Sequence, residues 1–228
     1  TSWFDNGKKH KELAYVNGKE DGRFTVWHES GPTAEEGRYR QGALEGRRIT
    51  YYPSGTKQSE GEYRGGKEVG QHVKLSESGT KIEIAEYREG KLHGRVTRFS
   101  EGGEKKEEAE YRSGMRHGMT RSFHRNGKQE SEGKYAQDER VGLWTFWRED
   151  GSKLEESELV AGKREGRVTR WYPKGVKEFE GAYKAGKKTG TWSYFDKEEG
   201  TLVREETYKN DVLLSKKVHK QDKPAKKK

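Results

Sequence analysis

Residues 95–118 read RVTRFSEGGEKKEEAEYRSGMRHG, and the glycine, aromatic and glutamate residues of this stretch recur along the chain at a constant interval. We number the residue that follows each closing glycine as position 1, so that the next closing glycine is position 24. The equally spaced closing glycines are Gly22, Gly46, Gly70, Gly94, Gly118, Gly142, Gly166 and Gly190. This strict period indicates about nine tandem copies of one structural unit, the first truncated because Thr1 falls at position 3.

Each copy has the pattern of a β-hairpin. Short segments rich in β-branched and aromatic residues are bounded by turn formers, as where residues 23–28 are followed by Glu29-Ser30-Gly31. The glycine that ends this turn recurs in the other copies, because the turn needs a residue with positive φ. The sequence therefore predicts a strand, a turn and a second strand in every copy.

Two positions of the unit carry large apolar side chains. Position 5 holds Trp27, Tyr51, Leu75, Phe99, Phe123, Trp147, Trp171 and Phe195, and position 17 holds Tyr39, Tyr63, Tyr87, Tyr111, Tyr135, Leu159, Tyr183 and Tyr208. If the strands pair in even register, positions 3, 5, 15 and 17 share one face, and the small residue at position 15 leaves room for a neighbouring ring. On the even face, the glutamates of position 14 are then expected near the basic residues of position 4, namely Lys74, Arg98 and Arg170.

An isolated hairpin is marginally stable in water, so each unit has to pack against its neighbours. We expect an all-β fold, an elongated repeat array of tandem antiparallel β-hairpins forming one long twisted single-layer sheet. The array is predicted to span residues 1–214, with residues 212–214 as a capping strand. A disordered lysine-rich tail is predicted over residues 215–228.

The composition argues against a large core and against several classes of site. Only 27% of the residues are hydrophobic, whereas 38% are charged. The chain has no cysteine, which excludes disulfides, cysteine-based metal sites and thiol catalysis, and no apolar run approaches the length of a membrane span. The net charge is +9, of which residues 215–228 carry +6 (seven lysines and one aspartate), so the other residues carry only +3.

The order of landmarks resembles that of a known family. An aromatic residue, a turn glycine, the Glu-small-Tyr group and a closing Gly-Lys-x-His-Gly are clearest in residues 99–118 and in YREGKLHG at residues 87–94. This order resembles the MORN repeat and is similar to the bacterial MORN variant of YwqK-type antitoxin proteins, over residues 1–211. The resemblance implies a chain of β-hairpins that serves as a non-catalytic scaffold contacting proteins or membrane lipids.

Extra aromatic residues distinguish the last three units. They lie at even positions: Trp144, Phe146, Tyr172, Trp192 and Tyr194. An exposed aromatic patch on a rigid sheet would suit a partner protein, a sugar or self-association. The alternative is that residues 212–214 or the curl of the sheet cover these rings, which would then belong to the core.

The second candidate site is the lysine-rich tail. Its basic residues are Lys216, Lys217, Lys220, Lys223, Lys226, Lys227 and Lys228. They would attract a polyanion such as anionic lipid or a cell-wall polymer, or they simply keep the terminus solvated. No base-stacking motif accompanies them, so sequence-specific binding of nucleic acid is not expected.

No enzyme, metal ion or cofactor is expected. His93 and His117 recur at one position of the unit, but no matching acidic or cysteine ligands accompany them, and a single-layer sheet offers no deep cleft. We favour a scaffold that binds a protein partner; the alternatives are an antitoxin-like inhibitor of a toxin and an envelope protein held by its basic tail. The absence of an initial methionine and of cysteine, together with the family's habits, favours the bacterial envelope or exterior over the cytoplasm.

Overall fold

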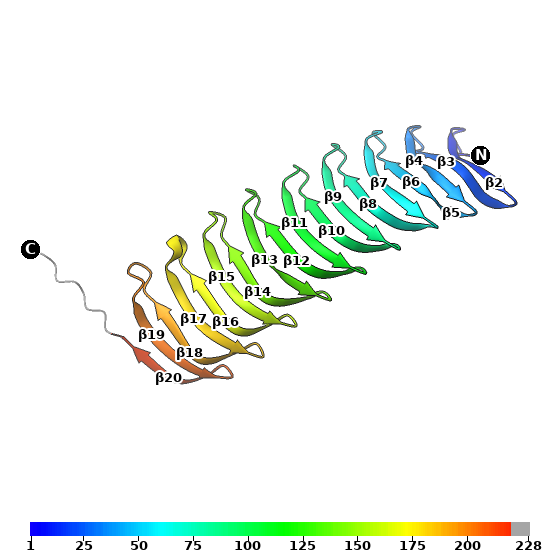
Figure 1. Cartoon of the computed structure of the whole chain (residues 1–228). Coiled ribbons are helices and arrows are strands. Elements are labelled where there is room, and N and C mark those ends of the chain that lie inside the picture. Colours follow the sequence, from blue (N-terminus) through cyan, green and yellow to red (C-terminus); the bar gives the residue numbers. More distant parts are fainter. Residues whose placement is uncertain (220–228) are drawn as a thin grey trace, which may run out of the picture. The chain divides into compact units, whose positions relative to one another are not determined.

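The computed structural model describes residues 1–219. These residues form twenty strands and one short 3-10 turn, and they contain no α-helix. They fall into two compact units, one comprising Thr1–Arg116 and one beginning at His117. Within each unit the strands lie side by side in a single layer and bend along their length (Figure 1). No helix in residues 1–219 is long and apolar enough to cross a membrane.

The strands of the first unit follow one another along the chain as antiparallel neighbours. They are β1 (Ser2–Trp3), β2 (Lys9–Val16), β3 (Lys19–Trp27), β4 (Thr33–Arg40), β5 (Ala43–Leu44), β6 (Gly46–Tyr51), β7 (Lys57–Arg64), β8 (Lys67–Leu75), β9 (Lys81–Arg88), β10 (Lys91–Phe99) and β11 (Lys105–Arg112). The short β5 and β6 together occupy the place that one strand takes in the other hairpins, and both pair with β4.

The second unit continues the same pattern. It contains most of β12 (Met115–Phe123), then β13 (Gln129–Ala136), β14 (Glu139–Trp147), β15 (Lys153–Val160), β16 (Lys163–Trp171), the 3-10 turn η1 (Pro173–Gly175), β17 (Lys177–Lys184), β18 (Lys187–Phe195), β19 (Leu202–Lys209) and β20 (Val212–Val218). The predicted all-β array of antiparallel hairpins is therefore confirmed. The strand predicted over residues 212–214 is also present, but β20 runs on to Val218. The predicted start of the tail at residue 215 is therefore too early, because residues 215–218 pair with β19.

Two kinds of turn alternate between the strands. In the longer turn, the backbone N–H of His28 donates to the carbonyl of Pro32, and that of Gly31 donates to the carbonyl of His28, each at 2.8 Å. The shorter turn has two residues, as in Gln41-Gly42, where both φ angles are positive (50° and 86°). Asp138 takes the place of glycine in one such turn with φ of 66°, which aspartate tolerates better than most residues.

The register differs from the even register that we expected. Next to the longer turn the pairing is even, since Phe99 faces Lys105 at positions 5 and 11. A β-bulge then inserts one residue, so Arg98 faces Glu107 and Val96 faces Ala109. A shift by one residue moves every following side chain to the opposite face. Positions 2 and 4 therefore share a face with positions 13, 15 and 17, and the prediction that positions 3 and 5 do so was wrong.

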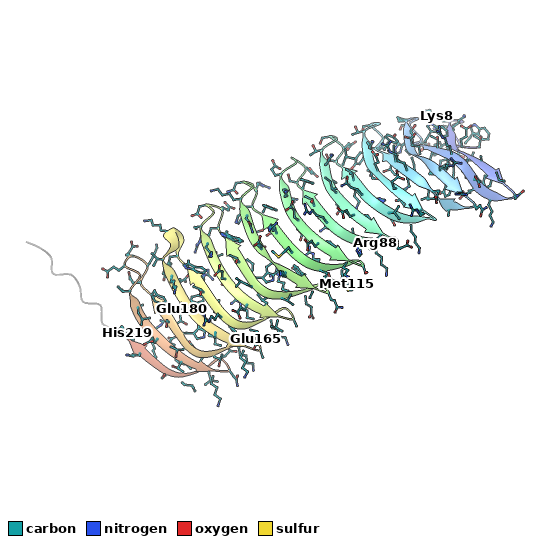
Figure 2. The ribbon with its side chains drawn as sticks, in the orientation of Figure 1. Lys8, Arg88, Met115, Glu165, Glu180 and His219 are labelled. Carbon is teal, nitrogen blue, oxygen red and sulfur yellow. The ribbon has the colours of Figure 1, made fainter. Side chains whose placement is uncertain are left out.

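We call this surface, with positions 2, 4, 13, 15 and 17, the tyrosine face; the other, with positions 1, 3, 14 and 16, is the glutamate face. Side chains cover both surfaces of the sheet (Figure 2). Several glutamates of position 14 bond the lysine three residues earlier, as Glu156 does with Lys153 at 2.5 Å; others include Glu60, Glu108 and Glu180. The same Lys153 amine lies 5.2 Å from the centre of the Trp171 ring, so position 5 borders the glutamate face.

Most of the core is a row on the tyrosine face, where position 2 packs against position 15; Ile49, at position 3, is buried on the glutamate face. Trp144 and Trp192 are each 1% exposed. They lie over Gly133 and Gly181 respectively, where a Cβ would come within 2.2 and 2.4 Å of the indole ring. Where position 15 is alanine, the residue of position 2 that faces it is smaller, as Val96 faces Ala85. The expected room for a ring at position 15 is present, but the ring that fills it comes from position 2.

Candidate functional site

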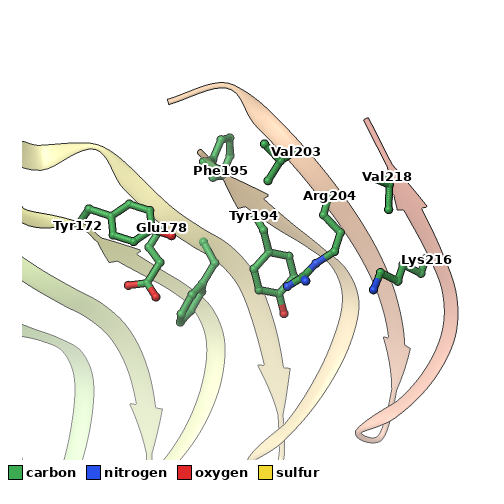
Figure 3. A pocket seen from close by; sticks show the side chains of 9 residues that line it. Tyr172, Glu178, Tyr194, Phe195, Val203, Arg204, Lys216 and Val218 are labelled. Atoms are coloured by element: carbon green, nitrogen blue, oxygen red, sulfur yellow. The ribbon is translucent and has the colours of Figure 1, made fainter. Parts of the chain in front are cut away.

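The second unit contains a hollow of about 620 Å³ on the tyrosine face beside its last strand. Its lining comes from β17, β18, β19 and β20 and from the residue that follows β16: Tyr172, Glu178, Phe179, Tyr194, Phe195, Val203, Arg204, Lys216 and Val218. We call it the C-terminal groove (Figure 3). Aromatic and aliphatic side chains form most of it, and three charged side chains give it polar contacts, a composition typical of binding sites.

Strand pairing places the side chains at the centre of the groove in one line across four strands. Phe179 faces Tyr194 across β17 and β18, and Tyr194 faces Arg204 across β18 and β19. Arg204 in turn faces Val218 on β20. The guanidinium carbon of Arg204 lies 4.0 Å from the centre of the Tyr194 ring, and Figure 3 shows the two side chains in contact. The groove is therefore lined by one transverse row of side chains, held in place by backbone pairing.

The corresponding row of the first unit is built of ion pairs. Lys74 contacts Glu83 at 2.9 Å, Glu83 contacts Arg98 at 3.0 Å, and Arg98 contacts Glu107 at 2.7 Å. These lysine and arginine residues were expected to pair with position 14, but the bulge places them opposite position 13. In the second unit, Arg170 also faces position 13, at Glu155 and Phe179, and it contacts Glu178 of position 12 at 3.1 Å. In the C-terminal groove, rings at Phe179 and Tyr194 replace the charged pairs, which gives this part of the sheet a different surface.

A buried carboxylate supports the basic end of the groove. Glu206 accepts a hydrogen bond of 2.8 Å from the hydroxyl of Tyr208, and its carboxylate lies 3.2 Å from Arg204 and 4.0 Å from Lys216. The Tyr208 hydrogen bond and then the positive charge of Arg204 lower the pKa of Glu206, against the opposing effect of burial. Burial raises the pKa of Tyr194. Glu206 stays ionised at neutral pH and holds Arg204 across the Tyr194 ring.

Two of the five aromatic candidates belong to the core. Trp144 packs against Tyr135 with ring centres 5.2 Å apart, and its indole N–H donates to the carbonyl of Lys134 at 3.2 Å. Trp192 packs against Tyr183 at 5.1 Å. The prediction that both lie on an exposed patch was wrong, because the face that carries position 2 also carries the tyrosines of position 17. Buried rings of this kind cannot contact a partner.

The other three aromatic candidates are partly exposed. Tyr172 and Tyr194 lie together in the C-terminal groove. Phe146 lies elsewhere on the tyrosine face, stacked on Trp144 with ring centres 6.1 Å apart, and it does not line the groove. The structure thus brings two of the predicted contacts together and separates the third from them.

The lysine candidates are divided between strand and tail. Lys216 and Lys217 lie in β20, opposite Glu206 and Glu205, and Lys216 lines the groove. The remaining lysine candidates lie outside the described residues: Lys220, Lys223, Lys226, Lys227 and Lys228.

Phe179, Glu178 and Arg204 are groove residues that the sequence reasoning missed. Phe179 occupies position 13, where most other units carry a polar side chain, so the substitution itself was a visible signal. Phe179 was overlooked because the expected even register does not place position 13 on the same face as position 4. No cluster of three or more potential metal ligands occurs within residues 1–219.

Comparison with known families agrees with the geometry. Residues 44–64 match the model of the MORN repeat variant, and no curated protein matches the chain. MORN repeats are generally associated with binding to proteins or membranes, and their all-β repeats typically serve as non-catalytic scaffolds.

Proposed function

We propose that this chain is a non-catalytic scaffold that binds a protein partner through the C-terminal groove. The observation that carries the proposal is the replacement of the charged row by Phe179 and Tyr194, which line a hollow of about 620 Å³ with Tyr172. A half-exposed aromatic surface bordered by opposite charges has the composition of the centre of a protein interface.

The other residues of the second unit are less suited to contacting a partner than the groove is. The tryptophans Trp144 and Trp192 hold the hairpins together, each being 1% exposed. The glutamate face is covered with paired charges, whose contribution to binding is usually small because exposed ion pairs are well hydrated. The groove is therefore the part of the second unit best suited to desolvation by a partner.

The test compares capture of proteins from cell extract by the full chain and by groove variants. We expect a specific protein to be retained at high salt by the unsubstituted chain and lost by the double variant Tyr172→Ala, Tyr194→Ala. Phe146→Ala is the matched control, since Phe146 shares position 4 with Tyr194 but lies outside the groove. Thermal melts must show that all variants remain folded; equal capture by all of them would refute the proposal.

A further inference from the structure

The last strand has an open edge. Within the described residues, β20 pairs with β19 and with no other strand. All seven residues of β20 are exposed, including the aliphatic side chains of Val212, Leu213, Leu214 and Val218 at 47–68%. An edge strand of this kind offers unpaired backbone N–H and C=O groups that can pair with another chain.

The charges on β20 indicate which kind of strand it would accept. Lys216 faces Glu206 and Lys217 faces Glu205, so two consecutive lysines meet two consecutive glutamates of β19. Both contacts are long, at 4.0 Å, and the two lysine side chains remain 49% and 73% exposed. A strand added on the open side would lie about 4.8 Å from β20 and would meet the same two lysines. Consecutive acidic residues in that strand would complete their pairing.

The groove indicates which kind of residue the added strand would carry opposite Val218. Val218 ends the transverse row that runs from Phe179 through Tyr194 and Arg204, and both Val218 and Lys216 line the groove (Figure 3). A residue opposite Val218 on the added strand would extend this row by one side chain. It would face an aliphatic neighbour and the aromatic hollow, so an apolar side chain fits there best.

Charge disfavours two other occupants of the edge. Residues 220–228 carry five lysines and one aspartate, and they would bring positive charge next to Lys216 and Lys217. A second copy of β20, antiparallel about Ser215, would place Lys216 opposite Leu214 and Lys217 opposite Leu213. That arrangement forms no ion pair across the new interface.

We propose that β20 accepts an extended segment of a protein partner as the next strand of the sheet. The segment carries two consecutive acidic residues opposite Lys216 and Lys217 and an apolar residue opposite Val218. This inference rests on the proposed function and specifies the partner that the C-terminal groove binds.

The test uses a fluorescent peptide and the full chain. The peptide LVVEETYK has the sequence of β19, which already pairs with β20 in the required charge register, with valine in place of the arginine that lies opposite Val218. Fluorescence anisotropy should show saturable binding, weakened about tenfold or more by Lys217→Glu and by the double variant Lys216→Glu, Lys217→Glu. A peptide with two lysines in place of its two glutamates should bind the double variant better than the original chain.

Backbone pairing is tested separately from charge. The same peptide is made with N-methyl groups at every second residue, in both possible phases, because only alternate backbone N–H groups of an added strand point toward β20. Strand addition predicts that one phase abolishes binding and the other preserves it. Equal binding by both phases, or no binding by the original peptide, would overturn the inference.

The result can be separated from that of the capture experiment. If the peptide does not bind but Tyr172→Ala, Tyr194→Ala still loses the captured protein, strand addition is wrong and the groove proposal stands. Failure of both experiments refutes both. Sedimentation is also used to test whether the particle grows with protein concentration. Growth that Lys217→Glu abolishes would show that a second copy of the chain occupies the edge, and would also overturn the inference.

Discussion

The indole ring of Trp144 lies over Gly133, so close that a Cβ on the glycine would come within 2.2 Å of it. The φ angle of Gly133 is not positive, so alanine is permitted by the backbone. Replacing a strand glycine by alanine would ordinarily stabilise a protein slightly. Here we expect Gly133→Ala to lower the free energy of unfolding by about 1–3 kcal/mol, measured by urea denaturation, because the ring must move.

The matched control for this prediction shrinks the ring. Trp144→Val in the Gly133→Ala background recreates the pair found at Val96 and Ala85. The costs of the two substitutions should then be less than additive by about 1 kcal/mol or more, as expected for residues in contact. Strict additivity would show that Gly133 and Trp144 are energetically independent.

Glu206 should make the stability of the second unit depend on acidic pH. Its pKa is lowered in the folded protein below the ordinary value of 4.5, chiefly by the Tyr208 hydroxyl. Its contribution is therefore present above pH 4.5 and is lost as pH falls through the lowered pKa. The free energy of unfolding should fall less between pH 6 and pH 3 in Glu206→Gln than in the unsubstituted chain. The exposed Glu198→Gln should leave the pH dependence unchanged, and equal slopes for all three proteins would contradict this role.

Arg98 should stabilise the first unit by bridging two carboxylates. It contacts Glu83 and Glu107, whose side chains are only 17% and 19% exposed. Arg98→Met would leave these two carboxylates without the cation between them, and we expect a loss of about 1–3 kcal/mol in urea denaturation. Arg95→Met, on the exposed glutamate face, is the control and should change stability by less than about 0.5 kcal/mol. A cost no larger than that of the control would mean that the bridge is thermodynamically neutral.

The lysine tail gives a prediction of its own, from the alternative envelope hypothesis. Residues 1–219 retain every described strand, so truncation there keeps the sheet and removes the five lysines that follow β20 together with Gln221, Asp222, Pro224 and Ala225. If the tail binds anionic surfaces, the full chain should sediment with phosphatidylserine vesicles at low salt, and the truncated chain should not. Neutral vesicles are the control. Equal sedimentation of both proteins would place any lipid contact elsewhere.

Part of the candidate site was predictable from sequence. Tyr172 and Tyr194 stood out as aromatic residues at positions that are polar in most units, and both line the groove. Trp144 and Trp192 also stood out as aromatic residues, but they occupy position 2, which is apolar in five of the eight units, and they lie in the core. The exposure of all four residues depends on what packs against them, and the repeat pattern does not state which face of the sheet carries the tyrosines of position 17.

The neighbours of Phe179 in the groove are decided by the strand register and not by the repeat pattern of the sequence. Its neighbours in the groove, Tyr194 and Arg204, lie on the two strands that follow, and only the strand pairing brings the three side chains together. A bulge beside each longer turn decides that position 4 faces position 13. Such a bulge leaves the period of the repeat unchanged, so the period cannot reveal it.

The hairpins, their number and their turns can be read from the amino-acid sequence, because they depend on local properties: alternation of side chains, and glycine where φ must be positive. Which side chains share a face, which tryptophans are buried and where the groove forms became known only from the folded chain. Strand register is chosen by the pairing and packing of neighbouring strands, and a slip of one residue exchanges the two faces of the sheet.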